Sequence, residues 1–236
     1  MTSLDPLVRC EAAARTYGGG ASAVVAVHGA TCEICPGDRI AVTGPSGSGK
    51  STLLHLIAAL EQPTSGNVSW HGLVGGPVPA QVAVVFQGPS LIPALNVIEN
   101  TALPMVLAGR PEASARRRAQ ECLERVGAAD LMDKLPEEIS GGQAQRAAVA
   151  RALAPRPRLI LADEPTGQLD RTTGRHVIDV LLAAADELGA AVVVTTHDPT
   201  VAERLILRWT MHAGRLSTEP PSPLVTPSTV PEGSTQ

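Results

Sequence analysis

Residues 39–60 read RIAVTGPSGSGKSTLLHLIAAL, and this stretch contains the most informative pattern in the sequence. RIAVT is a short apolar run typical of a buried strand, and KSTLLHLIAAL, residues 50–60, has the apolar spacing of a helix. The intervening residues 44–51, GPSGSGKS, fit the phosphate-binding pattern G-x-x-x-x-G-K-[ST]. Because that pattern requires a strand before it and a helix after it, the sequence predicts a phosphate site at this strand-to-helix turn.

The residue types of this loop suit phosphate binding. Glycines let the backbone turn so that N–H groups point at phosphate oxygens, and the helix N-terminus adds its positive dipole end. We expect Lys50 to reach the β- and γ-phosphates of a nucleotide, Ser51 to ligate Mg²⁺ and Thr52 to donate to a neighbouring phosphate. The predicted nucleotide-binding residues of the loop are Gly44, Pro45, Ser46, Gly47, Ser48, Gly49, Lys50, Ser51 and Thr52.

Three further apolar runs predict that the first strand belongs to a larger sheet. They are short and rich in β-branched residues, as strands buried on both faces of a parallel sheet are. The runs are VAVVF (82–86), LILA (159–162) and AVVVTT (191–196). Helical patterns alternate with them, at residues 113–126, 142–153 and 172–187. This alternation predicts an α/β fold with a mostly parallel sheet, while the first forty residues predict an antiparallel lobe.

Two carboxylates follow one of the predicted strands. Asp163 and Glu164 come directly after LILA, at the carboxyl end of the strand, where ligands of such sheets bind. We expect Asp163 to hold Mg²⁺ and Glu164 to polarise an attacking water as general base. Many strands end in solvated acids, so the pair is informative because it occurs together with the phosphate-binding loop.

The composition is that of a folded protein with one main domain. Of the 236 residues, 44% are hydrophobic and 18% are charged, which excludes wholesale disorder and a coiled-coil rod. The net charge of −4 gives no indication of nucleic-acid binding, and no nucleic-acid partner is expected. We expect residues 1–216 to form the nucleotide-binding domain and residues 217–236, rich in Pro, Ser and Thr, to be a disordered tail.

No targeting or membrane-spanning segment is predicted. The chain has no apolar run of the length that a spanning helix needs, and its start lacks the regions of a signal peptide, so we expect it in the cytosol. Cys32 and Cys35 form a C-x-x-C pair, but no second pair or histidine pair follows at metal-binding spacing. We therefore expect neither a zinc site nor a redox role for them.

ISGGQ, residues 139–143, is a second candidate anion site. It places small residues and a serine hydroxyl at the start of a predicted helix, as phosphate sites do, although a serine that only caps its helix has the same pattern. ISGGQ with the following AQRAAVARAL resembles the signature motif of ATP-binding cassette (ABC) proteins. The resemblance implies a P-loop NTPase of the ABC ATPase type, with a helical lobe that carries Ser140. It also implies that Ser140, Gly141, Gly142 and Gln143 bind the ATP of a partner subunit, so that two subunits close head to tail around two ATP molecules.

Four more residues match the ABC pattern in the right order. Tyr17, in RTYGG, resembles the aromatic residue that stacks on adenine, and Gln87 resembles the glutamine that senses Mg²⁺ and the attacking water. Asp170, in PTGQLD, resembles a residue that shapes the opposite site across the dimer, and His197 resembles the switch histidine that contacts the γ-phosphate. The resemblance thus implies Lys50, Gln87, Glu164 and His197 as catalytic residues and Ser51, Gln87 and Asp163 as Mg²⁺ ligands.

Within the family, the chain resembles the ATPases of lipoprotein-release and macrolide-export transporters, the LolD/MacB type. Residues 61–68, 91–109 and 162–170 carry this resemblance, whereas the stretch between Lys50 and Gln87 is shorter than in that group. The resemblance implies a transmembrane permease as partner, a second copy or homologous ATPase subunit, and a peripheral location on the cytoplasmic side of the membrane. The alternative is a non-transport ABC ATPase that acts mechanically on a membrane partner, such as a regulator of cell division or of the cell wall.

Overall fold

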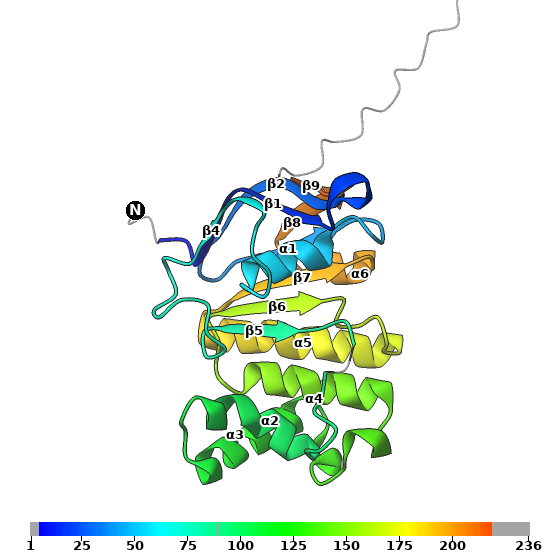
Figure 1. Cartoon of the computed structure of the whole chain (residues 1–236). Helices are drawn as coiled ribbons and strands as arrows, with labels where there is room; N and C mark the ends of the chain where they lie inside the picture. Colours follow the sequence, from blue (N-terminus) through cyan, green and yellow to red (C-terminus); the bar gives the residue numbers. More distant parts are fainter. Residues whose placement is uncertain (1–4, 89, 219–236) are drawn as a thin grey trace, which may run out of the picture.

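A six-stranded sheet forms the centre of the molecule, with helices on one side and a small second sheet on the other (Figure 1). The computed structural model describes residues 5–88 and 90–218. The elements in chain order are β1 (Val8–Tyr17), η1 (Gly20–Ser22), β2 (Val24–Ile34), β3 (Arg39–Thr43), α1 (Lys50–Ile57), β4 (Ser65–Ser69), β5 (Val82–Val85), α2 (Val97–Leu107), α3 (Glu112–Arg125), η2 (Ala129–Leu131), η3 (Pro136–Glu138), α4 (Gly141–Leu153), β6 (Leu159–Asp163), α5 (Arg171–Leu188), β7 (Ala191–Thr196), α6 (Pro199–Ala202), β8 (Leu207–His212) and β9 (Arg215–Ser217).

The central sheet has the strand order β5-β6-β7-β3-β8-β9. The strand pairs from β5 to β8 are parallel, and β9 pairs with β8 in the antiparallel direction. Every residue of β6 and β7 is buried, which explains their continuous apolar sequences. The mostly parallel α/β sheet predicted from the sequence is confirmed.

Side-chain alternation along the strands divides the interior into two cores. Ile40 and Val42 of β3 belong to the core that contains α1 and the small sheet, whereas Ala41 between them belongs to the core under the remaining long helices. This is the alternation that a strand imposes, since successive side chains point to opposite faces. Helix α1 therefore lies between the two sheets, and α5 covers the opposite face of the central sheet (Figure 1).

The small sheet is the antiparallel lobe predicted for the first forty residues. Its order is β2-β1-β4, so β1 and β2 pair as expected, but the third strand, β4, comes from residues beyond α1. Gly66 of β4 allows this close pairing with β1, because a Cβ atom there would lie 2.0 Å from the carbonyl oxygen of Ala12 and its φ is +75°. The prediction was correct for the lobe and incomplete in its strands.

Helices α2, α3 and α4 form a helical lobe beside α5 (Figure 1). Helices α3, α4 and α5 match the predicted helical ranges to within one residue at each end. Helix α2 was not predicted, because its sequence is apolar around most of its circumference and contains Pro104. Its start nevertheless has a local signal, a capping box in which Asn96 and Glu99 exchange side chain-to-backbone hydrogen bonds.

Strand β9 ends at Ser217, and the predicted tail from residue 219 onward lies outside the described residues. Among residues 5–88 and 90–218, no helix combines the length and the apolar character needed to traverse a bilayer. The domain boundary at residue 216 stays a prediction.

Candidate functional site

A cavity of about 570 Å³ lies at the carboxyl ends of the central strands. Its walls come from the loop after β3, the start of α1, the ends of β5, β6 and β7, and one residue of β2. The lining residues are Ala26, Ser46, Gly47, Gly49, Lys50, Ser51, Thr52, Gln87, Glu164 and His197. Most residues of the predicted phosphate-binding loop therefore meet three predicted catalytic residues from distant parts of the chain in one cavity.

Glycine is required at two points of the loop. Gly49 has a φ of +99°, and a Cβ atom there would lie 2.2 Å from the carbonyl oxygen of Ala26. Gly44 has a φ of +151°, and a Cβ atom there would lie 2.1 Å from the carbonyl oxygen of Met211. The loop can thus pack against β2 and β8 only because both residues lack a side chain.

Helix α1 begins inside this cavity without a side-chain cap. Gly49 occupies its N-cap position and Lys50, Ser51 and Thr52 form its first turn, all four lining the cavity. The first N–H groups of a helix have no partner within the helix, so they are available to an anion, which the helix dipole also favours. The Ser51 and Thr52 hydroxyls add two more donors in the same place.

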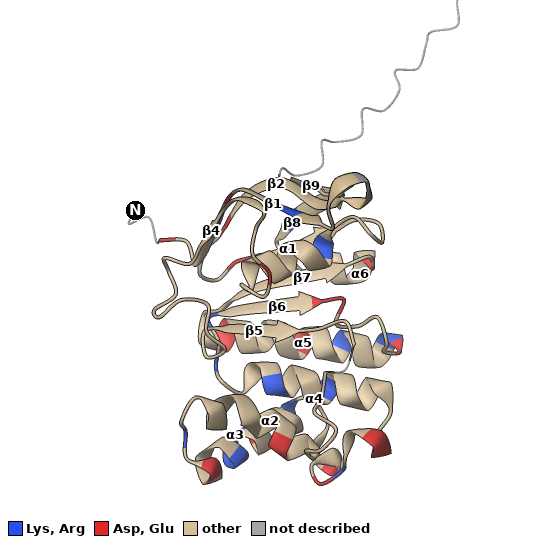
Figure 2. Cartoon of the chain, viewed as in Figure 1, with Lys and Arg blue, Asp and Glu red and all other residues tan. Residues whose placement is uncertain are grey.

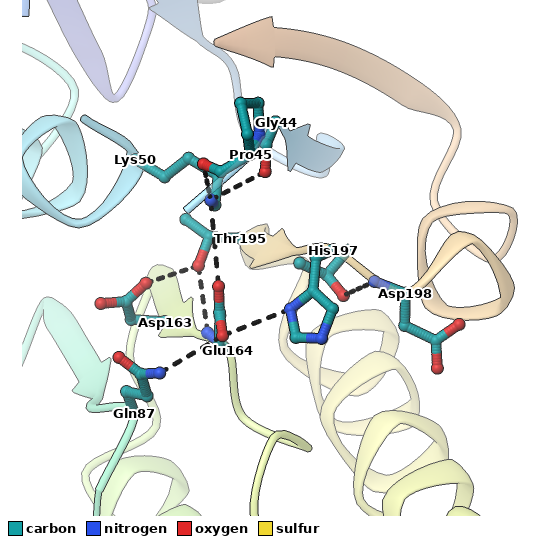
Figure 3. Close-up of polar contacts among 10 residues, drawn as sticks. Gly44, Pro45, Lys50, Gln87, Asp163, Glu164, Thr195, His197 and Asp198 are labelled. Atoms are coloured by element: carbon teal, nitrogen blue, oxygen red, sulfur yellow. Dashed lines mark hydrogen bonds and ion pairs between the residues drawn. The ribbon is translucent and has the colours of Figure 1, made fainter. Parts of the chain in front are cut away.

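Lys50 is 5% exposed, and its amino group is held by the loop (Figure 3). Its Nζ atom donates to the carbonyl oxygens of Gly44 and Pro45, both at 3.0 Å, and lies 3.9 Å from Oε1 of Glu164. Ser48 is also buried, and its hydroxyl makes no hydrogen bond within the described residues. Gly44, Pro45 and Ser48 are not among the residues that line the cavity, and the carbonyl groups of the first two hold the lysine.

Asp163 and Glu164 are fixed by Thr195, which the sequence analysis did not identify. Asp163, the last residue of β6, is 6% exposed, and its Oδ1 accepts a hydrogen bond from the Thr195 hydroxyl at 2.5 Å. The same hydroxyl accepts from the Glu164 N–H at 3.0 Å. Thr195 lies beside Asp163 in the β6–β7 register, a pairing that no local sequence pattern reveals.

Glu164 is the point on which the polar groups converge (Figure 3). Its Oε2 lies 3.3 Å from Nε2 of Gln87, which donates to it, and 3.4 Å from Nδ1 of His197. Figure 2 shows the acidic end of β6 and the basic start of α1 toward the same end of the strands. The structure thus brings Lys50, Gln87, Glu164 and His197 together, with Asp163 immediately behind them.

The backbone of Glu164 is strained. Its φ is +42°, in the left-handed region that a residue with a side chain occupies at a cost of about 1–3 kcal/mol. Two hydrogen bonds from its N–H group to Thr195, to the carbonyl oxygen at 3.1 Å and to the hydroxyl, hold this conformation. Strain of this kind concentrates at functional sites, where the surrounding structure fixes a side chain in place.

The predicted adenine-stacking residue lies outside the cavity lining. Tyr17 is at the end of β1, opposite Val24 in the register, and its side chain is 37% exposed. The Arg15 guanidinium lies over its ring, 4.8 Å from the centroid. Ala26, two residues beyond Val24 on β2, does line the cavity. Tyr17 is therefore an accessible ring close to this wall, and its role stays a prediction.

The ISGGQ motif forms the start of α4, and it does not line the cavity. Ser140 is the N-cap residue: its Oγ accepts from the Gln143 N–H at 3.3 Å, and its own N–H donates to Oε1 of Gln143 at 2.8 Å. A Cβ atom at Gly142 would lie 3.2 Å from the Leu169 side chain, and one at Gly141 would lie 3.5 Å from that of Gln168. The motif thus packs against the PTGQLD loop of its own chain.

Asp170 caps the next helix, α5. Its Oδ1 accepts hydrogen bonds from the N–H groups of Thr172 and Thr173, both at 3.0 Å. Hydrogen bonds from the Thr173 side chain and from these backbone groups hold the pKa of Asp170 below its ordinary value of 3.8. Like Ser140 and Gly141 of the ISGGQ motif, Asp170 is exposed and does not line the cavity that contains Lys50.

The cysteines lie in the antiparallel lobe and in α3. Cys10 and Cys32 face each other across β1 and β2 and are buried, while Cys35 is half-buried beyond the strand. The hydrogen bond with Cys10, followed by burial, raises the pKa of Cys32 far above its ordinary value. Within residues 5–88 and 90–218, no three His, Cys, Asp or Glu side chains are grouped so that they could hold a metal ion by themselves.

Comparison with sequence families and relatives agrees with the geometry. Residues 27–167 match the family described as "ABC transporter". The lipoprotein-releasing system ATP-binding protein LolD of Shewanella oneidensis is 38% identical over 90% of this chain and 96% of its own length. The LolD protein of Legionella pneumophila is 40% identical over 86% of this chain and 93% of its own length.

A solved structure has the same fold. The ATP-binding cassette MJ0796, determined as a dimer in a post-hydrolysis state with ADP and phosphate bound, superposes with a TM-score of 0.83 at 34% identity. The match covers 89% of this chain and 96% of that cassette. The fold of this chain is thus that of an ATP-hydrolysing cassette.

Proposed function

Since the chain belongs to the ABC transporter family, we propose that it powers a membrane permease of the lipoprotein-releasing type through the cavity at Lys50 and Glu164. The family membership makes it an ATP-binding and ATP-hydrolysing subunit that works with a membrane component by closing a dimer around ATP. What the proposal adds is the role of each residue, the metal ion, the location and the transported cargo.

The convergence on Glu164 is the observation that carries the proposed mechanism. A general base has to lie within hydrogen-bonding reach of the proton that it abstracts and next to the group that the water attacks. Glu164 borders the cavity that also contains the phosphate-binding loop, with Gln87 and His197 against the same carboxylate oxygen. A water placed between the three side chains would face a γ-phosphate bound at Lys50.

The roles follow from the groups that each residue offers. Glu164 orients and polarises the attacking water, and the His197 ring contacts the γ-phosphate and helps to orient that water. Lys50 changes partners, from the carbonyl oxygens of Gly44 and Pro45 to the β- and γ-phosphates, and neutralises the charge that develops there. The uncapped N-terminus of α1 adds backbone donors for the β-phosphate.

The residues also fit a Mg²⁺ ion bound together with the nucleotide. Ser51 and Gln87 line the cavity. Asp163 accepts from the Thr195 hydroxyl through Oδ1, and its other carboxylate oxygen has no hydrogen-bond partner among the described residues. Mg²⁺ prefers oxygen ligands and is commonly held by one or two carboxylates together with substrate phosphates, so a cluster of three acidic or histidine ligands is not needed. Bound there, the ion would neutralise charge on the β- and γ-phosphates.

The second half of the proposed site comes from another subunit. Ser140, Gly141, Gly142 and Gln143 lie outside the cavity of their own chain, yet they form a helix N-terminus suited to an anion. The proposal assigns them to the γ-phosphate held by the opposite chain, with Asp170 beside that phosphate and Tyr17 against the adenine. The dimeric state of the related cassette MJ0796 supports this arrangement.

The subclass, the cargo and the location rest on the relatives. Both LolD proteins are components of lipoprotein-releasing systems by name, and each match covers more than nine-tenths of the relative. The proposal therefore places this chain on the cytoplasmic face of a membrane, bound to a permease whose cargo is a lipoprotein.

A purification experiment tests the proposal. Glu164→Gln removes the base but keeps the side-chain shape, so this variant should bind ATP and hold its complex closed. Tagged Glu164→Gln chain, isolated from its own cells in mild detergent with ATP and Mg²⁺, should carry a membrane permease with it. The matched control is Glu203→Gln, which changes an exposed glutamate at the end of α6, outside the cavity, and should carry less. If lipoprotein stimulates ATP hydrolysis by the complex of this chain with the permease, the lipoprotein-releasing assignment is supported. If the membrane partner instead activates a cell-wall enzyme, the mechanical alternative is favoured.

ATP hydrolysis by the purified chain is the matching activity test. Wild type and Glu203→Gln should release phosphate from ATP only with Mg²⁺ present, and Glu164→Gln should be slower by a factor of about 10² to 10⁴, the usual contribution of a general base. Equal rates for wild type and Glu164→Gln would remove Glu164 from the mechanism.

A further inference from the structure

The segment that carries Gln87 is attached to helix α4 by two side chains. Gln87 itself points at Glu164, but the backbone on both sides of it is bound by residues of the helical lobe. We propose that Gln145 and Arg151 of α4 are positioning residues that hold Gln87 at the catalytic carboxylate and couple it to the helix that begins at Ser140. This inference rests on the proposed function.

Gln145 holds the backbone before Gln87. Its side chain is 1% exposed, and its Nε2 donates to the carbonyl oxygen of Phe86 at 3.0 Å. Its Oε1 is buried and makes no hydrogen bond with the described residues. A buried polar atom without a partner destabilises a fold, and an apolar side chain of the same size would avoid that cost. The amide is therefore better explained by its bond to Phe86 than by packing.

Arg151 holds the backbone after Gln87. Its guanidinium donates to the carbonyl oxygen of Ser90 at 2.6 Å through one nitrogen and to the Ser90 hydroxyl through the other. No carboxylate lies within ion-pair distance of it in the described part of the chain, and burial lowers the pKa of Arg151 from its ordinary value. A half-buried guanidinium that binds only neutral groups of one residue is best explained as a positioning group, because its planar set of donors fixes the orientation of the residue that it binds.

Both anchors are on the same helix as the ISGGQ motif. Ser140 is the N-cap residue of α4, and Gln145 and Arg151 follow within that helix. The Gln87 side chain lies 3.3 Å from Glu164 while Phe86 and Ser90, on either side of it in sequence, are bound to α4. A shift of α4, for instance when Ser140 meets a nucleotide on a second chain, would therefore move Gln87 relative to Glu164. Helix α4 would thus be linked to both halves of the proposed site, to Glu164 through Gln87 and to the nucleotide of a second chain through Ser140.

Asn100 of α2 continues the attachment further along the segment. It is fully buried, accepts from the Ile92 N–H at 2.7 Å and donates to the carbonyl oxygens of Ile92 and Leu95 at 3.1 and 2.8 Å. These bonds hold residues that are further from Gln87, so they serve to fix the end of the segment. The bonds from α4 are the ones adjacent to the catalytic side chain.

Two substitutions with one matched control separate positioning from packing. Gln145→Met keeps size and burial but removes the bond to Phe86, and Arg151→Met does the same for Ser90. Arg146→Met is the control, because Arg146 is on the same helix and donates to the carbonyl oxygens of Val126 and Gly127, which are distant in sequence from Gln87. Arg151→Lys keeps the charge and one donor nitrogen in place of two, and should rescue part of the activity.

The expected pattern is a loss of kcat without a loss of folding or of ATP binding. In the purified full chain, Gln145→Met should keep or raise the melting temperature, keep the Kd for ATP and lower kcat by about tenfold or more, because small misplacements of a catalytic group can cost about 10²-fold. Arg146→Met should leave kcat unchanged. A parallel fall in melting temperature and kcat for all three Met variants would mean that the bonds only stabilise the fold, and would overturn the inference.

A double-mutant cycle with Gln87→Ala gives the decisive result. If Gln145 and Arg151 act through Gln87, replacing them should have no further effect on kcat once the Gln87 side chain is gone, since residues in one pathway are not additive. Full additivity would overturn the positioning role while wild-type ATP hydrolysis leaves the proposed function standing. Absence of hydrolysis by wild type would instead refute the proposed function itself.

Discussion

The N-termini of α1 and α4 contain similar groups but differ in what those groups already bind. Each begins at glycine and a small hydroxyl residue, as a phosphate site does. At α1 no side chain caps the helix, and its first turn lines the cavity with Lys50 and Glu164. At α4 the Ser140 and Gln143 side chains satisfy two of the free backbone donors, and the helix start does not line that cavity.

This difference indicates how the work is divided. The α1 end has its free backbone donors, Lys50 and the Glu164 carboxylate in one place, so under the proposed function a single chain would bind a nucleotide there. In the part of the chain that the structure describes, the α4 end lies outside the cavity of Lys50 and Glu164, and its capping box makes it stable without a ligand. Under the proposed function, its contribution to hydrolysis would therefore depend on a second chain.

Lys50→Ala should remove the function of the α1 end. The substitution deletes the charge next to the phosphates, and we expect ATP affinity and kcat to fall together, with kcat lower by a factor of about 10² to 10³ or more. Lys134→Ala is the matched control, because these are the two lysines of the chain and Lys134 is exposed on the helical lobe. Nucleotide binding by calorimetry and phosphate release measure the effect, and similar behaviour of both variants would contradict the role of Lys50.

Ser140→Asp should separate the two roles of the α4 end. Aspartate is as good an N-cap as serine, so the melting temperature should stay close to that of wild type, while its charge should repel a phosphate from a second chain. We expect kcat to fall more than tenfold without a change in ATP affinity, because charge-assisted phosphate contacts are lost. Ser140→Ala should lower stability by about 1 kcal/mol through the lost cap and reduce kcat less. Full activity of Ser140→Asp would show that Ser140 only caps its helix.

Asp170→Asn should have the smallest effect, on the pH dependence of folding. The pKa of Asp170 is held below its ordinary value of 3.8 in the folded chain. A lowered carboxylate pKa stabilises the fold above the unfolded-state pKa, and this contribution is lost as the pH falls through the lower, folded-state value. Asparagine caps without titrating, so the melting temperatures of wild type and variant should converge below pH 3.8 and differ slightly at pH 7. A constant difference at all pH values would contradict the assignment.

Much of the fold follows from local patterns in the sequence. The strands at residues 39–43, 159–163 and 191–196 are short, apolar and buried on both faces, and such runs are recognisable one at a time. Helix α2 escaped prediction because a helix that is apolar on most sides has no polar face to give it a period. Strand β4 was not predicted because its sequence, SGNVS, has only one buried residue. It forms a strand because it pairs with β1.

Residues of the candidate site could likewise be predicted only where a local motif contains them. The loop with Lys50 and the acids after β6 carry their chemistry in local motifs, so they could be predicted from the residues alone. Thr195 is fixed by the register of two strands, and the attachment of Gln145 and Arg151 to Phe86 and Ser90 joins residues about sixty positions apart. Such contacts depend on the fold as a whole, and a single sequence contains no local signal for them.

The role of the α4 end in a second chain is tested by the mass of the Glu164→Gln chain in solution, measured by sedimentation velocity with and without ATP and Mg²⁺. We expect a monomer without nucleotide and a dimer of twice the mass with ATP. We also expect Ser140→Asp in the same chain to abolish the dimer while ATP still binds. An ATP-dependent dimer that forms equally well with Ser140→Asp, or bound ATP with no change of mass in either variant, would contradict the claim that the α4 end completes the site of a second chain.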